Sequence, residues 1–203
     1  MTSYADVTAS LRVAYDGDAA RRDATDKEPW KLDERAAFLD RLRTGDRLLE
    51  VGAGTGQDSV YFRDHGLDVV AVDLSSEMVA LCRAKGLDAH VRDFLDLGFP
   101  PGSFDAVFAF NCLLHVPTAD LPAVLSSLVA VLRRGGLLFV GVYGGDGTEG
   151  PLEGDEHDPP RFFSWRTDEQ WREHAGRYFE IVDFHVRELG DRRFQSLTLR
   201  RPV

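Results

Sequence analysis

Short apolar runs and helix-like segments alternate through the middle of this chain. Strands separated by helical patterns of about ten residues form βαβ units, whose strands pair in parallel. The run 104–110 is apolar almost throughout, as expected for a strand covered by helices on both faces. The sequence therefore predicts an α/β fold with a doubly wound, mostly parallel sheet. The expected strands span residues 47–51, 68–72, 87–91, 104–110 and 137–143, and the helices between them span 57–65, 75–85 and 119–132.

The C-terminal part of the chain is predicted to complete this sheet. Two runs of alternating polarity, 179–186 and 194–199, are typical of an antiparallel hairpin. They would bring the sheet to seven strands, with an antiparallel last strand and helices on both faces. Thr167, followed three residues later by Gln170, forms a capping-box pattern that predicts a helix over 167–175.

Two segments lie outside this alternation. Residues 1–29 are polar, and we expect a short helix near residues 11–15 followed by a loose or helical charged stretch. Residues 30–43 predict a further helix. Residues 144–166 are rich in Gly, Pro and acidic residues, and insertions of this length are usually functional or disordered. His157 and the acidic residues around it predict a charged surface loop, because contiguous residues seldom converge on one metal ion.

The composition fits one domain and does not exclude a small-molecule substrate of any charge. A length of 203 residues suits a single domain. The net charge of -10 argues against general binding of nucleic acid or anionic membranes, because phosphate contacts need clustered Lys and Arg. Two cysteines in different segments predict neither a disulfide framework nor a zinc site, so a reduced cytoplasmic setting is expected. We find no apolar run that predicts a signal peptide or a membrane span.

A glycine-rich loop from Glu50 to Gly56 is the most specific motif. Glycines there let the main chain turn sharply and approach a ligand. Asp73 follows Gly52 by 21 residues, at the end of the next strand, where a carboxylate can accept hydrogen bonds from ribose hydroxyls. A dinucleotide fingerprint would place its third glycine at the position of Gln57, so a dinucleotide site fails on spacing.

This loop and four later motifs together resemble those of class I S-adenosylmethionine-dependent methyltransferases. The motifs follow the family's order and cover residues 45–143. One departure is Arg134, where the family often has proline. The motifs are Glu50-x-Gly52-x-Gly54-x-Gly56, Val70-Ala71-Val72-Asp73-Leu74-Ser75 with Met78, Arg92-Asp93-Phe94, Phe104-Asp105-Ala106-Val107 through Leu114-His115, and Leu132-Arg133-Arg134-Gly135-Gly136-Leu137-Leu138.

The resemblance implies S-adenosylmethionine as the cofactor. Asp73 would hold the ribose, Leu74 and Met78 would flank the adenine, and Asp93 would accept a hydrogen bond from the adenine amino group. Tyr15 lies in a Tyr-Asp pair that related methyltransferases often carry in an N-terminal helix covering the cofactor. The cofactor-binding candidates are Tyr15, Glu50, Gly52, Ala53, Gly54, Asp73, Leu74, Met78, Asp93, Phe94, Asn111 and Cys112.

Two candidate catalytic residues follow strands at the edge of the sheet where α/β proteins bind ligands. His115 could act as a general base, since imidazole titrates near neutral pH, or it could simply cap the loop before Val116. Tyr143 could shape the acceptor pocket or form a hydrogen bond with the acceptor. We expect no metal ligand.

The resemblance implies transfer of the cofactor's methyl group to an O, N or C nucleophile of a small molecule. Phe162, Phe163 and Trp165 favour an apolar or aromatic acceptor. The alternatives are cyclase-type, non-methylating chemistry on the same fold and a cofactor-binding protein, because fold does not fix function. We expect a monomer or homodimer. Its single domain would comprise a helical lid (1–44), a cofactor-binding core (45–143), an insertion or lid (144–166), and a C-terminal helix and hairpin (167–203).

Overall fold

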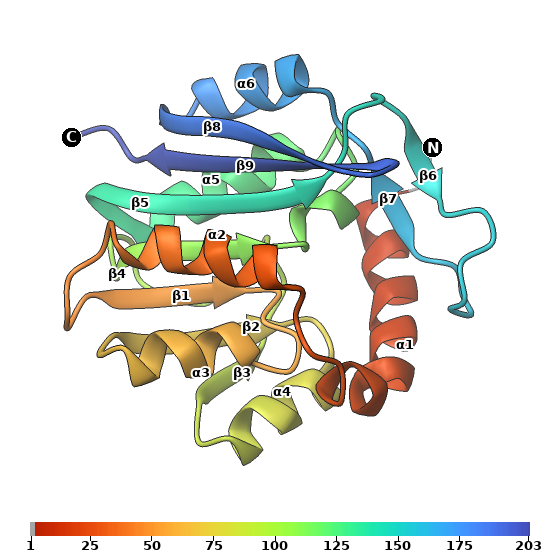
Figure 1. Ribbon diagram of the computed structural model, residues 1–203, viewed down its shortest axis with the longest axis horizontal. Coiled ribbons are helices and arrows are strands. Elements are labelled where there is room, and N and C mark those ends of the chain that lie inside the picture. Colours follow the sequence, from red (N-terminus) through yellow and green to blue (C-terminus); the bar gives the residue numbers. More distant parts are fainter. Residues whose placement is uncertain (1–2) are drawn as a thin grey trace.

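The computed structural model describes residues 3–203 and is built around a seven-stranded sheet (Figure 1). Its strands are β1 (Arg47–Val51), β2 (Asp68–Asp73), β3 (Asp88–Val91), β4 (Phe104–Phe110), β5 (Leu132–Tyr143), β8 (Glu180–Leu189) and β9 (Arg192–Arg200). They lie in the order β3-β2-β1-β4-β5-β9-β8. The pairs from β3 to β5 are parallel, whereas β9 runs antiparallel to both of its neighbours. The predicted fold class is therefore confirmed.

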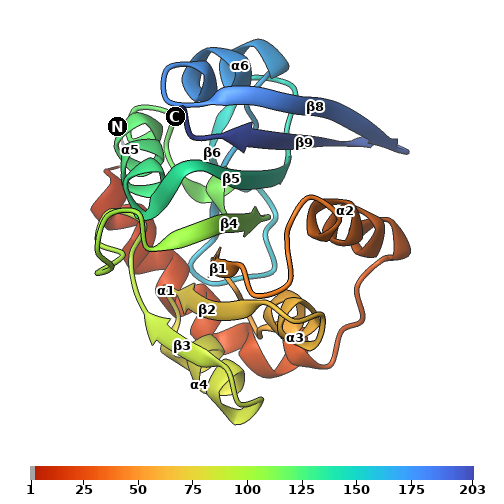
Figure 2. The same cartoon turned by 90° about the vertical axis from the view of Figure 1, so that its left-hand side faces the viewer.

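Helices cover both faces of the sheet (Figure 2). They are α1 (Tyr4–Asp23), α2 (Pro29–Leu39), α3 (Gln57–Asp64), α4 (Ser76–Ala84), α5 (Leu121–Val131) and α6 (Asp168–Gly176), with a 3-10 turn at Leu113–His115. On one face, α2 and α3 pack Phe38 and Phe62 against Phe108 of β4. On the other, α5 and α6 contribute Leu128 and Trp171 to the largest apolar cluster. This double cover explains why the central strands are mostly apolar.

Most element boundaries follow from local chemistry that the sequence displays. The predicted bounds of β1 and β4 are confirmed without change. Ser75 caps α4 by accepting a hydrogen bond from the Met78 amide at 3.1 Å. The capping box of Thr167 and Gln170 is present at the start of α6. β5 differs from its predicted span of 137–143, because it begins at Leu132 and pairs with Phe104 before a register shift.

The N-terminal segment is more ordered than its sequence indicates. Instead of a short helix near residues 11–15, α1 is one helix of 20 residues with a Ser3–Asp6 capping box. Its buried residues Val7, Leu11 and Ala14 share one face. That face packs on α4 and on the insertion, and α1 stands across the carboxyl ends of the parallel strands (Figure 1).

The insertion 144–166 folds into a separate two-stranded hairpin of β6 (Glu149–Pro151) and β7 (Phe162–Ser164). The prediction of a charged surface loop around His157 is wrong for two side chains. Those of Asp155 and His157 are 2% and 7% exposed. They are buried because the loop packs against α1, a contact between segments far apart in the sequence. None of the described helices combines the length and apolarity needed to cross a bilayer.

Candidate active site

Two adjoining cavities lie at the carboxyl edge of the sheet, beneath α1. Both are lined by Arg22, Gly52, Gly54, Phe110 and Asn111. The first cavity extends along the ends of β2 and β3. It is also lined by Tyr4, Thr8, Leu11, Tyr15, Asp73, Leu74, Met78, Arg92, Asp93, Phe94, Cys112, His115 and Val116. The second extends over the start of α3 and is also lined by Arg21, Thr25, Asp26, Lys27, Lys31, Glu50, Ala53, Thr55, Gln57 and Asp58.

The structure brings together most of the residues that the sequence singled out. Eleven of them line the first cavity: Tyr15, Gly52, Gly54, Asp73, Leu74, Met78, Asp93, Phe94, Asn111, Cys112 and His115. Glu50 and Ala53 lie in the second cavity. Tyr143 lines neither. It packs instead against Trp30 and Phe194, with ring centroids 6.2 and 5.2 Å apart.

The glycine loop needs its glycines for two physical reasons. Gly52 and Gly56 have φ values of 64° and 79°, a region that residues with a side chain rarely adopt. A Cβ on Gly52 would also overlap the side chain of Cys112, and one on Gly56 would lie 2.6 Å from Leu87 Cδ1. Gly54 differs, because a Cβ there would point into open space. The loop therefore packs closely on the protein while leaving room for a ligand at Gly54.

Asp73 links the loop to the end of β2. Its Oδ2 accepts a hydrogen bond from the Gly54 amide at 2.8 Å, and its Oδ1 accepts one from the Ser75 amide at 2.9 Å. Burial raises the pKa of this carboxyl, and the two amide hydrogen bonds partly offset that rise. Each oxygen keeps a further lone pair for a ligand donor.

Asp93 is held from above by α1. The Tyr4 hydroxyl donates to Asp93 Oδ1 at 2.8 Å, and the Leu95 amide donates to the same oxygen at 2.8 Å. Within residues 3–203 no hydrogen bond reaches Asp93 Oδ2, so that oxygen is left to face a ligand. Tyr4 was missed by the sequence analysis, because a helix 89 residues away gives no local signal of this contact.

Glu50 is fully buried behind the loop and accepts a hydrogen bond from the Ser59 hydroxyl. Burial, followed by repulsion from Asp58, raises its pKa to about 8. Asp58 is itself paired with Lys27 and Arg35. The Asp73 carboxyl adds to this repulsion. The glycine-loop end of the site therefore favours a cationic ligand, because an added positive charge lowers the free-energy cost of burying these carboxylates.

Asn111 and Cys112 follow β4 directly. Asn111 has a φ of 54°, and its buried Oδ1 has no hydrogen-bond partner within the described part of the chain. A buried acceptor without a partner costs free energy, so this oxygen is suited to a ligand donor. The Cys112 thiol contacts the Val51 carbonyl oxygen at 3.2 Å, and burial raises its pKa well above the usual value. Cys112 is therefore a neutral packing residue rather than a nucleophile.

His115 is buried and held at both ring nitrogens. Nδ1 lies 2.7 Å from the Phe162 carbonyl oxygen, which can only accept, so Nδ1 carries the hydrogen. Nε2 consequently accepts from the Tyr15 hydroxyl at 2.6 Å. Burial lowers the pKa of His115 to about 4, and Arg161 and Arg22 add to this effect. Near neutral pH the imidazole is uncharged, and its basic nitrogen is occupied by Tyr15.

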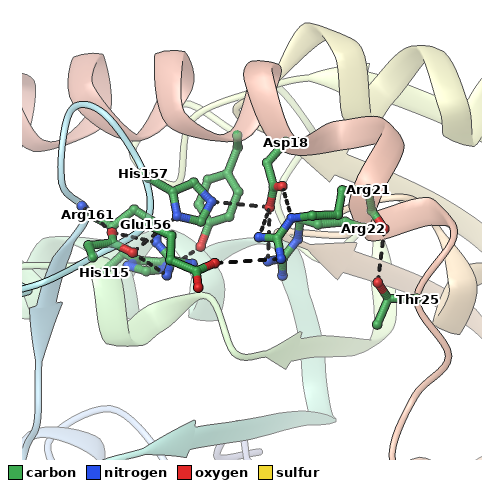
Figure 3. A network of polar contacts seen from close by, with 10 residues as sticks. Asp18, Arg21, Arg22, Thr25, His115, Glu156, His157 and Arg161 are labelled. Carbon is green, nitrogen blue, oxygen red and sulfur yellow. Dashed lines mark hydrogen bonds and ion pairs between the residues drawn. The ribbon is translucent and has the colours of Figure 1, made fainter.

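A network of charged side chains joins α1 to the insertion (Figure 3). His157 Nε2 lies 3.1 Å from Asp18, and its Nδ1 lies 3.1 Å from Asp155. Both carboxylates can only accept hydrogen bonds, so His157 links α1 to the insertion as a donor. Arg161 binds both oxygens of Asp155 at 2.9 and 2.8 Å and holds the pKa of that carboxyl well below its usual range. Arg21 binds both oxygens of Asp18 at 2.5 and 3.0 Å.

Residues 49–140 match the family described as methyltransferase domain. This range contains the glycine loop, Asp73, Asp93 and the end of β4, all of which meet at the cavities. Residues 49–140 are thus similar to a methyltransferase domain, in agreement with the resemblance of the motifs to class I S-adenosylmethionine-dependent methyltransferases.

One sequence relative and two solved structures of similar fold illustrate what the chain is similar to. It is 35% identical over 133 residues to a ubiquinone biosynthesis O-methyltransferase of Xanthomonas oryzae, covering 62% of this chain and 54% of that protein. The chain thus spans about half the length of the curated relatives it matches. The Burkholderia thailandensis 1,6-didemethyltoxoflavin-N1-methyltransferase, solved with S-adenosylhomocysteine, has a TM-score of 0.83 at 22% identity and covers 100% of this chain and 92% of its own. A 4+2 cyclase has a TM-score of 0.68 at 22% identity, and the match covers 89% of this chain and 85% of the cyclase chain.

Proposed function

We propose that this protein transfers the methyl group of S-adenosylmethionine to a small-molecule acceptor. The observation that carries the proposal is one cavity where the glycine loop, Asp73, Asp93 and Cys112 converge from four neighbouring strands. When bound, the cofactor supplies an electrophilic methyl group on a sulfonium that leaves readily. The protein then needs chiefly to align the acceptor with that methyl group and to exclude water.

The residues present suit the adenosine part of this cofactor and its positive charge. The free lone pairs of Asp73 would accept hydrogen bonds from the ribose hydroxyls, and Asp93 Oδ2 would accept one from the adenine amino group. Leu74 and Met78 line the cavity between these two carboxylates and would flank the adenine. The raised pKa of Glu50 supports a ligand that brings positive charge, as a sulfonium and an ammonium both do.

Tyr15 and His115 would close the site over the cofactor. The hydrogen bond between them joins α1 to the loop after β4, and His115 is also bound to the insertion through Phe162. Before acting as a general base, His115 would have to release Tyr15 and accept a proton despite its low pKa. We therefore assign Tyr15 and His115 to water exclusion and acceptor alignment. The acceptor would lose its proton to solvent when it takes the methyl group.

The acceptor would be a small aromatic or apolar molecule. Phe110 lines both cavities next to Asn111, and Trp30 packs on it with ring centroids 6.3 Å apart. In the insertion, Phe163 stacks on Trp165 with ring centroids 4.9 Å apart. The Phe163 ring also packs edge-on against the His115 ring, with centroids 4.7 Å apart. The relatives named for ubiquinone biosynthesis and for didemethyltoxoflavin support a small-molecule acceptor.

Incubation with S-adenosylmethionine labelled on its methyl group tests this function. The acceptor panel should contain phenols, hydroquinones and nitrogen heterocycles, with product detection by mass spectrometry. We expect a product heavier by one methyl group and a stoichiometric yield of S-adenosylhomocysteine. Tight cofactor binding without transfer to any acceptor would contradict methylation.

Cyclase-type chemistry is the second candidate, supported by the 4+2 cyclase of similar fold. A cyclase would leave the cofactor's methyl group in place and convert its substrate into an isomer of the same mass. The labelling experiment separates the two functions, because only methylation releases S-adenosylhomocysteine. A cofactor-binding protein would yield neither product.

We also propose an organisation for the chain around this function. Residues 1–44 and 144–166 would act as lids on the core 45–143, and the segment 167–203 would complete the sheet; of the first lid, residues 1 and 2 lie outside the described range. The net charge of -10 supports a protein that does not bind nucleic acid. We propose that it is a cytoplasmic monomer or homodimer. Size-exclusion chromatography with light scattering would determine the oligomeric state.

A further inference from the structure

The turn that carries His115 leaves main-chain carbonyl groups in the core of the protein. It is a single 3-10 turn, and Leu113, Leu114 and Val116 are at most 2% exposed. The Leu113 oxygen accepts a hydrogen bond from the Val116 amide at 3.2 Å, whereas no main-chain amide within residues 3–203 donates to the Val116 oxygen. Buried carbonyl groups need donors, so another segment must supply them.

Arg166, the last residue of the insertion, supplies these donors. It is 1% exposed. Its Nη1 donates to the Leu113 oxygen at 3.2 Å, and its Nη2 donates to the Val116 oxygen. The guanidinium therefore holds the main chain on both sides of His115.

This buried site is a costly place for a cation. Arg161 and Arg193 each pair with a carboxylate, but Arg166 forms no ion pair within the described part of the chain, and its buried Nε has no hydrogen-bond partner there. Burial lowers the pKa of Arg166 to about 10. Stability alone would favour an apolar side chain at such a site, so the two hydrogen bonds to the turn point to a further role.

The insertion holds the same segment at two more points. The Phe162 carbonyl oxygen accepts a hydrogen bond from His115 Nδ1 at 2.7 Å. Just beyond the turn, the hydroxyl oxygens of Thr118 and Ser164 lie 2.9 Å apart. Residues 113–118 are thus fastened to β7 and to Arg166 as one unit, and the position of the His115 ring depends on the insertion.

We propose that Arg166 is a positioning residue, which fixes the turn 113–116 so that His115 presents Nε2 to the Tyr15 hydroxyl and closes the site over the acceptor. A guanidinium suits this task, because its planar fork reaches two carbonyl groups at once, whereas an ammonium is a single point of contact. Arg166 itself lines neither cavity and acts through His115. This inference rests on the proposed function, in which Tyr15 and His115 align the acceptor.

The tautomer of His115 tests the assignment by NMR without cofactor or acceptor. With isotopically labelled histidine nitrogens, and with His115→Gln to identify the signal, the folded wild-type protein should show the Nδ1–H form near neutral pH. Arg166→Met removes both hydrogen bonds to the turn and should give a mixture of the Nδ1–H and Nε2–H forms. The pKa of His115 should also rise from about 4 toward 6.5, because a loosened turn admits water.

Arg201→Met is the matched control for the loss of an arginine that binds carbonyl groups. Arg201 donates to the oxygens of Val129, at 2.8 Å, and Leu132, near the amino end of the β5 strand. This variant should leave the His115 tautomer unchanged. An unchanged tautomer in Arg166→Met, or the same mixture in Arg201→Met, would overturn the assignment.

Arg166→Lys keeps the charge and serves as the test variant if Arg166→Met does not fold. An ammonium in place of the fork should retain part of the hold on the turn, so the tautomer mixture should be of the same kind but smaller. A wild-type tautomer in a folded Arg166→Lys would show that the fork is not needed, which also overturns the assignment.

Kinetics with an acceptor found by the labelling experiment gives a second readout. Arg166→Met should lower kcat about 10- to 100-fold and raise the KM for the acceptor, with the KM for S-adenosylmethionine changed less than about twofold, because misalignment affects the acceptor. A lower kcat with both KM values unchanged would mean only a loss of active enzyme and would contradict positioning. Failure to find any acceptor would contradict the proposed function, whereas the tautomer would still decide the role of Arg166.

Discussion

Asp73 occupies the position where the loop, β2 and the expected ribose meet. Replacing it with Ala removes a buried carboxylate that would accept two ligand hydrogen bonds. We expect the affinity for S-adenosylhomocysteine to fall by about 1.5–3 kcal/mol, measured by calorimetry. Asp68→Ala is the control, since Asp68 lies at the exposed start of the same strand. Unchanged affinity in Asp73→Ala would refute the ribose assignment.

Gly52 and Gly54 should respond differently to the same added methyl group. Both have positive φ, at 64° and 55°, so Ala strains the backbone at either position. At Gly52 the new Cβ also meets Cys112, and we expect a loss of about 2–4 kcal/mol in unfolding free energy. At Gly54 the Cβ enters open space, so ligand affinity should suffer more than stability.

Urea unfolding and calorimetry on the two variants would test this contrast. Gly45→Ala is a suitable control for backbone strain alone, because Gly45 has a φ of 87° and open space around its Cβ, far from the cavities. Equal losses of stability at all three positions would show that the close approach of Cys112 is unimportant.

At the scale of elements, α1 and the insertion depend on each other. Neither segment is stable by its own propensity, because α1 buries few apolar residues and the hairpin has two strands of three residues each. The buried contacts of His157 with Asp18 and Asp155 join them over the cavities. Removing one partner of a buried charge network leaves the others without compensation.

His157→Gln should therefore loosen both segments together. We expect faster amide hydrogen exchange in α1 and in residues 144–166, with the sheet unaffected, and a loss of about 2–4 kcal/mol in local opening free energy. His90→Gln is the control, since His90 pairs with Asp88 at an exposed site where ion pairs contribute little. Faster exchange in one segment alone would contradict their mutual dependence.

Helices and strands that are determined by neighbouring residues in the sequence could be predicted from it. β4 is apolar except for Asp105, and α6 begins at a capping box, so both were located correctly. α1 could not be predicted at its full length, because its few apolar residues are stabilised by α4 and Phe162, distant in the sequence. β5 extends beyond its predicted start for the same reason, since pairing with Phe104 determines its first residue.

At the scale of the whole molecule, the residues at the carboxyl edge of the sheet could be predicted from the sequence. The contacts that α1 makes above that edge could not. Parallel strands bring their carboxyl ends to one edge, so Asp73, Asp93 and Asn111 had to lie near one another. Nothing local indicates that Tyr4 reaches Asp93 or that Tyr15 reaches His115, 100 residues away. Tyr143 lines neither cavity, because Trp30 covers the end of its strand, and its role toward the acceptor stays a prediction.

Two buried groups should make the stability of the whole fold depend on pH. The pKa of His115 falls from 6.5 to about 4 on folding, so its contribution is complete above pH 6.5 and is lost as the pH falls through about 4. The pKa of Glu50 rises from 4.5 to about 8, so its contribution is complete below pH 4.5 and is lost as the pH rises through about 8. Between pH 4.5 and 6.5 the two slopes oppose each other.

From pH 6.5 to 8 only the Glu50 slope of this pair remains, so the unfolding free energy should decrease over this range. Glu50→Gln cannot ionise and keeps the hydrogen bond with Ser59, so its stability should decrease less than that of the wild-type protein. Urea unfolding at pH 6.5, 7.2 and 8 measures the difference between the two profiles. Parallel profiles would mean that Glu50 already ionises normally in the folded protein, and the charge argument for a cationic ligand beside the loop would lose its basis.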